Sequence, residues 1–353
     1  MSTLVSITAP SSAPGDAAAT SHQIHALPVV VMFPHNQCNC RCVMCDIWRI
    51  RQAKEITPAD LEQHLDSFRG LGVRWVVLSG GEPQLNEKWS YLAQMLRSAG
   101  CRVTLLTAGL LLESEAHVVA DSVDDVIISL DGPPAVHNNI RRVENAFEQL
   151  ARGVSAVRHI RPNMHVGGRC TVQKANHRSL RAVVRSAKQI GLTSISFLAA
   201  DLTSSAFNRP EGWLPDRADR VALTPAEIDA LESEVERLID EHHADLESGF
   251  VVESAPKLRR IVRHFRAHAH QAEPIAPRCN APWVSTVIEA SGDVRPCFFH
   301  PVMGNIYREP LAEIVNSPQA RQFRATLDVA NNEICRRCVC SLYIPREHEA
   351  TGH

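Results

Sequence analysis

VVVMFPHNQCNCRCVMCDIW, residues 29–48, is the stretch that decides the fold. Its first residues are almost all apolar, as in a strand that is buried on both faces. A loop rich in thiols follows at once, with Cys38, Cys42 and Cys45 in the spacing C-x3-C-x2-C. The sequence therefore predicts a buried strand that delivers three cysteines to the loop after it, where barrel enzymes place their chemistry.

Apolar runs and amphipathic stretches alternate after this loop. Thr57 before Pro58 is a capping residue followed by a proline at the first helical position, and Gly100 and Gly191 are helix-stop residues. The strands expected, including the first, are 28–33, 74–79, 102–106, 125–130, 165–172 and 194–198. Repeated β–α units predict an α/β fold with a parallel, barrel-like sheet and its working face at the carboxyl ends of the strands.

The chain divides into five parts by composition. We expect a flexible tail at 1–27, the barrel at 28–201, a helical connecting segment at 202–272, a cysteine-rich module at 273–345 and a tail at 346–353. The connecting segment begins with a loop and contains a basic helix with Arg259, Arg260, Arg263 and Arg266. A solvated helix face is the simpler interpretation of these arginines, and an anion-binding role is the alternative.

Composition excludes several classes of function. The 353 residues are 44% hydrophobic and 22% charged, with a formal net charge of −2. No basic stripe suits a phosphate backbone, so we expect no nucleic-acid partner. No apolar run approaches the roughly 20 residues that span a bilayer, and the N-terminal residues lack the pattern of a signal peptide. We therefore expect a cytoplasmic protein without a membrane segment.

The eleven cysteines indicate metal binding. Nine of them fall in two groups, 38–45 and 279–340, and a cytoplasmic protein keeps its thiols reduced. Three thiolates in the first group would hold a cubane iron–sulfur cluster and leave one iron open, as catalytic metal sites do. A zinc site with Cys40 as fourth ligand is the alternative. It is disfavoured because Cys38 and Cys40 point opposite ways in an extended chain.

Glycine and polar residues stand at the ends of later strands. The second strand ends in Ser79-Gly80-Gly81-Glu82-Pro83, where two glycines allow close backbone approach and the carboxylate suits an ammonium group. Ser129 and Asp131 project to one side of the fourth strand and suit hydroxyl groups or an amino acid, with helix capping as the alternative. Arg169 on the fifth strand is a possible carboxylate partner.

The second cysteine group contains a predicted hairpin. Residues 284–288 form one strand, Ser291-Gly292-Asp293 the turn, and Val294 begins the return, so Cys279 and Cys297 on its flanks can meet. The C-x2-C pair Cys335 and Cys338 completes a closed four-thiolate site for a cluster, with structural zinc as the alternative. Cys340 is either spare or replaces Cys338.

Together, C-x3-C-x2-C after the first strand and GGEP after the second resemble the radical S-adenosylmethionine (SAM) superfamily. The resemblance implies a partial (β/α)6 TIM-like barrel and a [4Fe–4S] cluster whose free iron binds SAM. It implies that Gly80, Gly81 and Glu82 hold the SAM amino group. Met44 occupies the position where the family usually has an aromatic residue near the adenine. Ser129, Asp131 and Arg169 would contact the remainder of SAM.

The C-terminal pattern C-x12-G-x4-C, followed by C-x2-C, resembles the SPASM/twitch extension of the same family. This resemblance implies an auxiliary [4Fe–4S] cluster on Cys279, Cys297, Cys335 and Cys338. In the family, a donor such as flavodoxin or ferredoxin reduces the first cluster. The reduced cluster cleaves SAM to a 5′-deoxyadenosyl radical, which removes a hydrogen atom from the substrate.

We therefore expect an oxidoreductase that acts on a sugar-like or natural-product small molecule, with the auxiliary cluster accepting an electron. A peptide-modifying enzyme is the first alternative. Such enzymes often carry an extra leader-binding domain, and only a short tail precedes the first strand here. A non-catalytic iron–sulfur or zinc protein is the alternative from another class.

Overall fold

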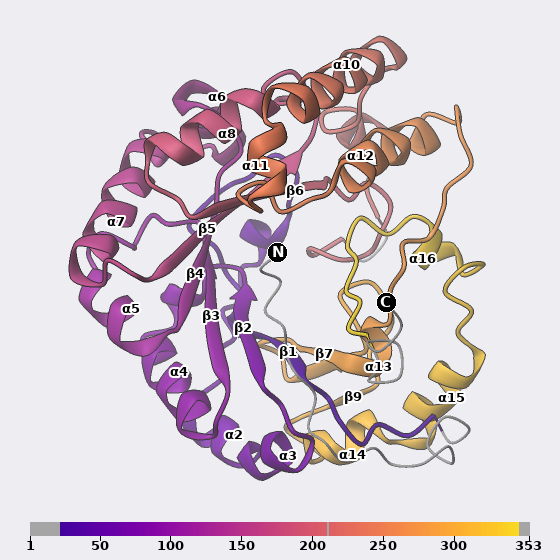
Figure 1. Ribbon diagram of the computed structural model, residues 1–353. Helices are drawn as coiled ribbons and strands as arrows, with labels where there is room; N and C mark the ends of the chain where they lie inside the picture. The colour runs from indigo at the N-terminus through magenta and orange to yellow at the C-terminus, as the bar shows by residue number, and fades with distance from the viewer. Residues whose placement is uncertain (1–21, 210–211, 346–353) are drawn as a thin grey trace.

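An open parallel sheet forms the centre of the computed structural model, which describes residues 22–209 and 212–345 (Figure 1). All six expected strands are present, and their ends lie within two residues of the predicted ones. Each strand pairs in parallel with the next one along the chain, so the sheet order follows the sequence. These strands are β1 Val29–His35, β2 Trp75–Gly80, β3 Arg102–Thr107, β4 Asp125–Ser129, β5 His165–Val172 and β6 Ser194–Ala199.

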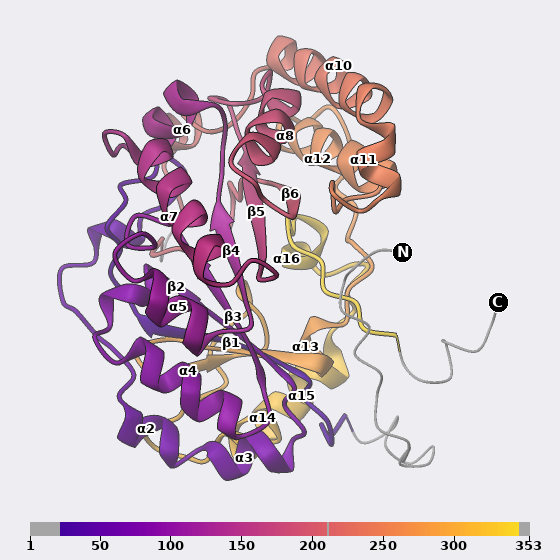
Figure 2. The same ribbon diagram turned by 60° about the vertical axis from the view of Figure 1, so that its left-hand side comes forward.

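Helices cover the outer face of this sheet, as Figure 2 shows for α4, α5, α7 and α8. The Thr57 side chain accepts from the Asp60 N–H and completes a capping box at the start of α2. The buried side chains of α8 include Val183, Val184 and Ala187, which join the main core. These helices are α2 Pro58–Glu62, α3 Leu65–Gly70, α4 Trp89–Ser98, α5 Ala116–Ser122, α6 Pro134–Arg141, α7 Ala146–Ile160 and α8 Leu180–Gln189.

The C-terminal residues extend the same sheet. The predicted hairpin is confirmed as β7 (Ser285–Ile288) and β8 (Asp293–Arg295), and β9 (Gly304–Asn305) pairs with β8. The sequence did not indicate that β7 also pairs in parallel with β1, with Val29 opposite Ser285. The nine-stranded sheet therefore runs β6-β5-β4-β3-β2-β1-β7-β8-β9. This pairing places the hairpin of the second cysteine group directly beside the strand that leads into the first group.

The partial barrel stays open, because β6 and the C-terminal strands are opposite edges of the sheet (Figure 1). The connecting segment lies beyond β6 as α9 Pro215–Ala218, α10 Pro225–Glu241, α11 His243–Glu247 and α12 Ala255–His268. The remaining C-terminal helices are α13 Ala281–Val284, α14 Leu311–Val315, α15 Pro318–Thr326 and α16 Glu333–Arg336. In the described residues, no helix is long and apolar enough to cross a membrane.

Packing begins before β1. Residues 1–21 and 346–353 of the expected tails lie outside the described part, but Ile24 and Leu27 are buried in the main core. The backbone N–H of Ile24 donates to Asn316 Oδ1 at 2.8 Å, and Asn316 Nδ2 donates back to the Ile24 carbonyl at 2.9 Å. Residues 24–27 therefore belong to the packed structure and not to a flexible tail.

Replacing Leu27 tests this packing, because its side chain has no exposed surface. We expect Leu27→Ala to lower the free energy of unfolding by about 2–5 kcal/mol through lost burial and the cavity left behind. Urea denaturation followed by circular dichroism measures this change. Leu214→Ala is the control, since Leu214 is 74% exposed; equal effects of the two substitutions would contradict the packing of this segment.

Candidate functional site

The loop between β1 and the short helix η1 (Ile47–Arg49) carries the first cysteine group. One N–H group donates to each of the three predicted ligand sulfurs at 3.5 Å: Cys40 N to Cys38 Sγ, Ile47 N to Cys45 Sγ, and Arg141 Nη1 to Cys42 Sγ. Hydrogen bonds of this kind stabilise negative charge on sulfur and tune iron–sulfur clusters. Each of the three predicted ligands therefore has an N–H donor that would stabilise a thiolate.

Cys40 lies closer to the ligands than the sequence indicated. The chain turns between Cys38 and Cys42, so the argument from an extended chain does not apply. Hydrogen bonds to the Cys38 and Cys42 thiols, together with burial, hold the pKa of Cys40 well above its usual range. The same bond from Cys40, with the charge of Arg141, lowers the pKa of Cys42 to about 7. These opposite shifts favour proton retention by Cys40 and proton loss by Cys42.

The two glycines after β2 let the backbone approach the cysteine loop. Gly80 has φ +110°, and a Cβ there would lie 2.7 Å from the Phe33 Cβ. A Cβ on Gly81 would overlap the carbonyl oxygen of Gln37, one residue before Cys38. The Glu82 N–H donates to that carbonyl at 2.8 Å. The GGE turn is therefore fastened to the backbone that leads into the first cysteine.

The Glu82 side chain points away from solvent and ties this turn to the end of β3. It is 1% exposed, and its Oε2 accepts the Ala108 N–H at 2.8 Å. Burial raises the pKa of Glu82 to about 7, although the N–H donors oppose that shift. Ala108 also packs against Cys40 and Cys42. The carboxylate therefore holds two strand ends around the thiols.

Arg141, at the end of α6, braces the cysteine loop. Its guanidinium lies 2.6 Å from Asp131 Oδ2 and reaches the Cys42 sulfur. Burial alone would lower the pKa of Arg141, but the facing carboxylate and thiols raise it above the usual value. The carbonyl of Arg141 also accepts the Arg41 N–H at 3.1 Å. Backbone and side chain of one residue thus position the loop.

Asp131 has a different environment from the one predicted for a cofactor contact. It has no exposed surface, and its second oxygen accepts the Thr171 N–H at 3.0 Å. The Asp131 N–H donates to His137 Nδ1, and burial lowers the pKa of His137 to about 4, so this ring is neutral. The carboxylate is committed to Arg141 and Thr171, which leaves it no surface for SAM. Ser129 is only half-buried and stands opposite Arg169 in the sheet.

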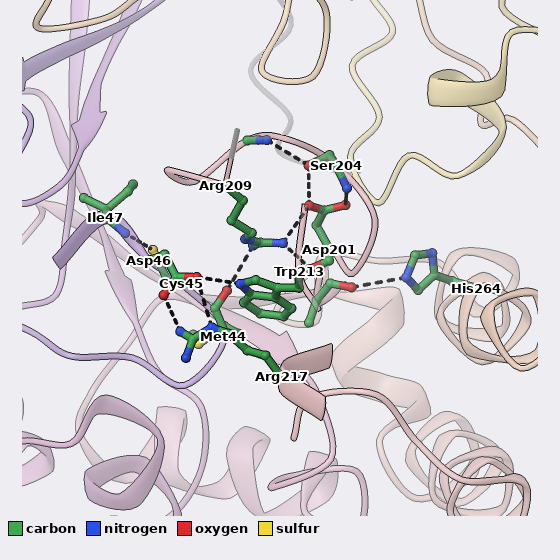
Figure 3. A network of polar contacts seen from close by, with 12 residues as sticks. Met44, Cys45, Asp46, Ile47, Asp201, Ser204, Arg209, Trp213, Arg217 and His264 are labelled. Atoms are coloured by element: carbon green, nitrogen blue, oxygen red, sulfur yellow. Dashed lines mark hydrogen bonds and ion pairs between the residues drawn. The ribbon is translucent and has the colours of Figure 1, made fainter. Parts of the chain in front are cut away.

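A segment after β6 folds over the cysteine loop and was not identified from the sequence (Figure 3). Asp46 anchors it: Trp213 Nε1 donates to Asp46 Oδ2 at 2.5 Å, and Arg217 pairs with the same carboxylate. Arg209 Nη2 donates to the Met44 carbonyl at 3.2 Å. Its guanidinium carbon lies 3.9 Å from the Trp213 ring centroid. Met44 itself packs with the cysteines and Ala108.

The second cysteine group brings five thiols together. Cys279 and Cys297 both raise the pKa values of Cys335, Cys338 and Cys340, so the five thiols lie close enough to interact. His300 Nε2 lies 3.3 Å from the Cys335 sulfur, and the backbone N–H groups of Phe299 and His300 bond to Cys297. Sulfur atoms in this group therefore also have polar partners.

Asn280 joins the two pieces of this group and was missed by the sequence analysis. Its backbone N–H donates to the Leu342 carbonyl at 2.9 Å, and its side chain exchanges two hydrogen bonds with Ile344. The residue after Cys279 is thus clamped to the chain that follows Cys340. Burial raises the pKa of Cys340 to about 11, and the charge of Arg169 on β5 opposes that shift.

Aromatic rings connect the two cysteine groups. Phe33 on β1 lies 5.9 Å from Phe298, which follows Cys297. Phe298 and Phe299 are 6.3 Å apart, and Phe299 is 6.3 Å from Phe207 in the segment over the first loop. The pairing of β7 with β1 explains this proximity. A row of four phenylalanine rings therefore links β1, the residues after Cys297 and the segment over the first loop.

The thiols of the described residues do not converge on one point as the ligands of a bound zinc ion would. A zinc ion holds each sulfur at about 2.3 Å, so its ligands converge on one point. Within residues 22–209 and 212–345, no three His, Cys, Asp or Glu side chains form such a group. A cubane spreads its cysteines around a larger body. Among the described residues the structure therefore holds no preformed site for a single metal ion.

Comparisons with known proteins agree with this geometry. Residues 32–190 match the model of the radical SAM superfamily, and residues 279–339 match that of SPASM, an iron–sulfur cluster-binding domain. The AdoMet-dependent heme synthase of Methanosarcina barkeri is 27% identical over 89% of this chain and 90% of that protein. The PqqA peptide cyclase of Streptomyces rochei is 28% identical over 86% of this chain and 79% of that protein.

Among solved structures, Streptococcus suis SuiB bound to its precursor peptide SuiA superposes with a TM-score of 0.65. It is 15% identical and covers 93% of this chain and 74% of SuiB, so it supports the fold alone. The two family matches include all three predicted ligands of the first group and four of the five thiols of the second. The chain is thus a radical SAM enzyme with a C-terminal SPASM iron–sulfur domain.

Proposed function

We propose that this enzyme is an oxidoreductase that removes a hydrogen atom from a small-molecule substrate, with the SPASM-region cluster accepting an electron. The observation that carries the proposal is the set of three N–H donors to Cys38, Cys42 and Cys45. These donors support three thiolates, and three protein ligands leave one iron of a cubane open to SAM. Open coordination is what a catalytic cluster needs and a structural one lacks.

The residues proposed to hold SAM lie on the cysteine loop, at the carboxyl ends of β2 and β4, and on β5. The Gly80-Gly81 turn offers backbone groups to its amino group, Met44 offers an apolar surface for the adenine, and Ser129 and Arg169 offer a hydroxyl and a cation. Glu82 and Asp131 are positioning residues, because both carboxylates are buried and bonded to protein groups. Bound SAM and the cluster supply the 5′-deoxyadenosyl radical, and the protein supplies position and exclusion of water.

A small-molecule substrate is favoured by the length of the heme synthase match. That similarity covers 89% of this chain and 90% of the relative. The name of that relative indicates a porphyrin product, which is a small molecule.

A peptide substrate is the second candidate. The PqqA peptide cyclase matches a similar share of the chain at similar identity. The two candidates differ in the substrate that gives up the hydrogen atom. Deuterium transfer into 5′-deoxyadenosine from a labelled small molecule or from a labelled peptide would show which of them is the substrate.

The proposed setting is the cytoplasm, with flavodoxin or ferredoxin as electron donor. All eleven cysteines are free in the structure, as a reducing compartment would keep them.

Cys42→Ala tests the first centre. We expect anaerobically reconstituted Cys42→Ala, given dithionite and SAM, to release no 5′-deoxyadenosine, because the cluster loses one of three ligands. Liquid chromatography with mass spectrometry measures the product. Cys101→Ala is the matched control, since Cys101 is a buried core thiol far from both groups in the sequence; release by Cys42→Ala at the control rate would refute the assignment.

Cys297→Ala tests the second centre. We expect this variant to keep some SAM cleavage but to lose product formation, because the first cluster remains and the electron acceptor is damaged. Counting 5′-deoxyadenosine and substrate product in the same reaction measures both. Full turnover would rule out an electron-accepting role for the second cluster.

Arg141→Met tests the effect of the Arg141 guanidinium on the first cluster. Removal of one positive charge and one N–H···S bond should make the reduction potential of the first cluster more negative, because the reduced cluster carries the additional electron. An EPR-monitored redox titration measures this potential. Arg142→Met is the control, because Arg142 is the neighbouring exposed arginine; an unchanged potential in Arg141→Met would show that Arg141 has no electronic effect.

A further inference from the structure

The basic helix α12 has two charged faces with different partners. Arg259 pairs with Glu236 of α10 at 2.6 Å, and Arg266 pairs with Glu232 at 2.7 Å. Arg260 instead donates to the Cys338 carbonyl at 2.5 Å. One face therefore attaches α12 to α10, and the other is directed toward the C-terminal cysteine segment. A single solvated basic face does not describe this helix.

The second face lines a pocket between α12 and the segment around α16, which lie on the open side of the barrel in Figure 1. The cavity volume is about 30 Å³. A buried water requires roughly 10–15 Å³ by this measure, so the pocket accommodates a group of a few atoms. Six of its lining residues are basic: Arg260, Arg263, His264, His268, Arg336 and Arg337.

Carboxylates balance only part of this charge. Arg336 lies 3.1 Å from Glu273, and Arg337 lies 3.8 Å from Glu333. Both glutamates are more than four-fifths exposed, so these pairs are weak. Within the described chain, Arg263 has no carboxylate partner, and its guanidinium donates to the Glu273 carbonyl at 3.2 Å.

The charge of Arg260 interacts with thiols of the second cysteine group. Burial lowers its pKa, and the thiols of Cys338, Cys340 and Cys279 oppose that shift. This cation is therefore the partner of the second cysteine group. Arg263, with Arg337 opposite, remains to attract an anion from solvent. Burial and the charge of Arg337 lower the pKa of His268, and a neutral imidazole can donate or accept a hydrogen bond.

We propose that this pocket binds the carboxylate or phosphate group of an anionic small molecule. Guanidinium groups present several N–H donors in a plane that matches oxyanions of this shape. The volume suits one such group. Cys338 lines the same pocket, so the rest of the molecule would lie near the second cysteine group. The binding of an anion does not depend on the proposed function. The further step of taking this anion to be the enzyme's substrate rests on that proposed function.

Isothermal titration calorimetry on the anaerobic holoenzyme tests the pocket directly. Inorganic phosphate and acetate, titrated separately, show which anion the pocket accepts. We expect saturable binding of at least one of them at one site per chain. Arg263→Ala should weaken that binding about tenfold or more, the effect of losing a charged hydrogen-bond donor. Arg263→Lys should retain part of the affinity, because it keeps the charge.

Arg259→Ala is the matched control, because it removes an exposed arginine from the other face of the same helix. We expect its anion affinity to equal that of the unchanged protein. Absence of saturable binding for both anions, or equal losses in Arg259→Ala and Arg263→Ala, would overturn the proposal. The titration requires no SAM cleavage, so an absence of anion binding would not contradict the radical chemistry. Likewise, an absence of 5′-deoxyadenosine release would not contradict anion binding.

Discussion

Three thiolates must be held at fixed positions on a loop that has little regular structure of its own, and the rest of the site follows from that constraint. Each sulfur receives one N–H donor, at 3.5 Å in all three cases. The surrounding elements then fix the loop from three sides: the glycine turn after β2, the end of α6, and the segment anchored on Asp46. Rigid support of this kind lets the protein leave one coordination position open without losing the cluster.

Buried charges provide much of that support. Asp131 and Arg141 form a pair with almost no exposed surface, and Glu82 is enclosed between two strand ends. Ionic groups in such places are costly unless each has partners. Here every one of these charges serves the thiols directly or through one neighbour. This role differs from a direct cofactor contact, and it explains why substitution at these positions should alter the cluster itself rather than only the affinity for SAM.

Local patterns predicted the strands and the hairpin, because burial and turn chemistry are readable over a few residues. The six apolar runs and the Ser291–Asp293 turn are examples. Contacts between distant segments were not predictable: Asp46 and Arg217 are 171 residues apart, and β1 meets β7 across most of the chain. Asp131 was expected near the cofactor because alternation along a strand predicts the side to which a side chain points. Alternation does not identify the group that the side chain contacts, which is Arg141 here. The extended-chain argument for Cys40 failed for a similar reason, since hydrogen bonds turn that loop.

The most direct test of the central claim is electron–nuclear double resonance on the reduced first cluster. The Cys297→Ala variant would simplify the spectrum, and SAM labelled with ¹⁵N in its amino group and ¹⁷O in its carboxylate would be the probe. The account predicts hyperfine coupling from both labels, because the iron without a cysteine is free to bind them. Spectra without coupling from either label, in protein shown to contain the cluster, would contradict it.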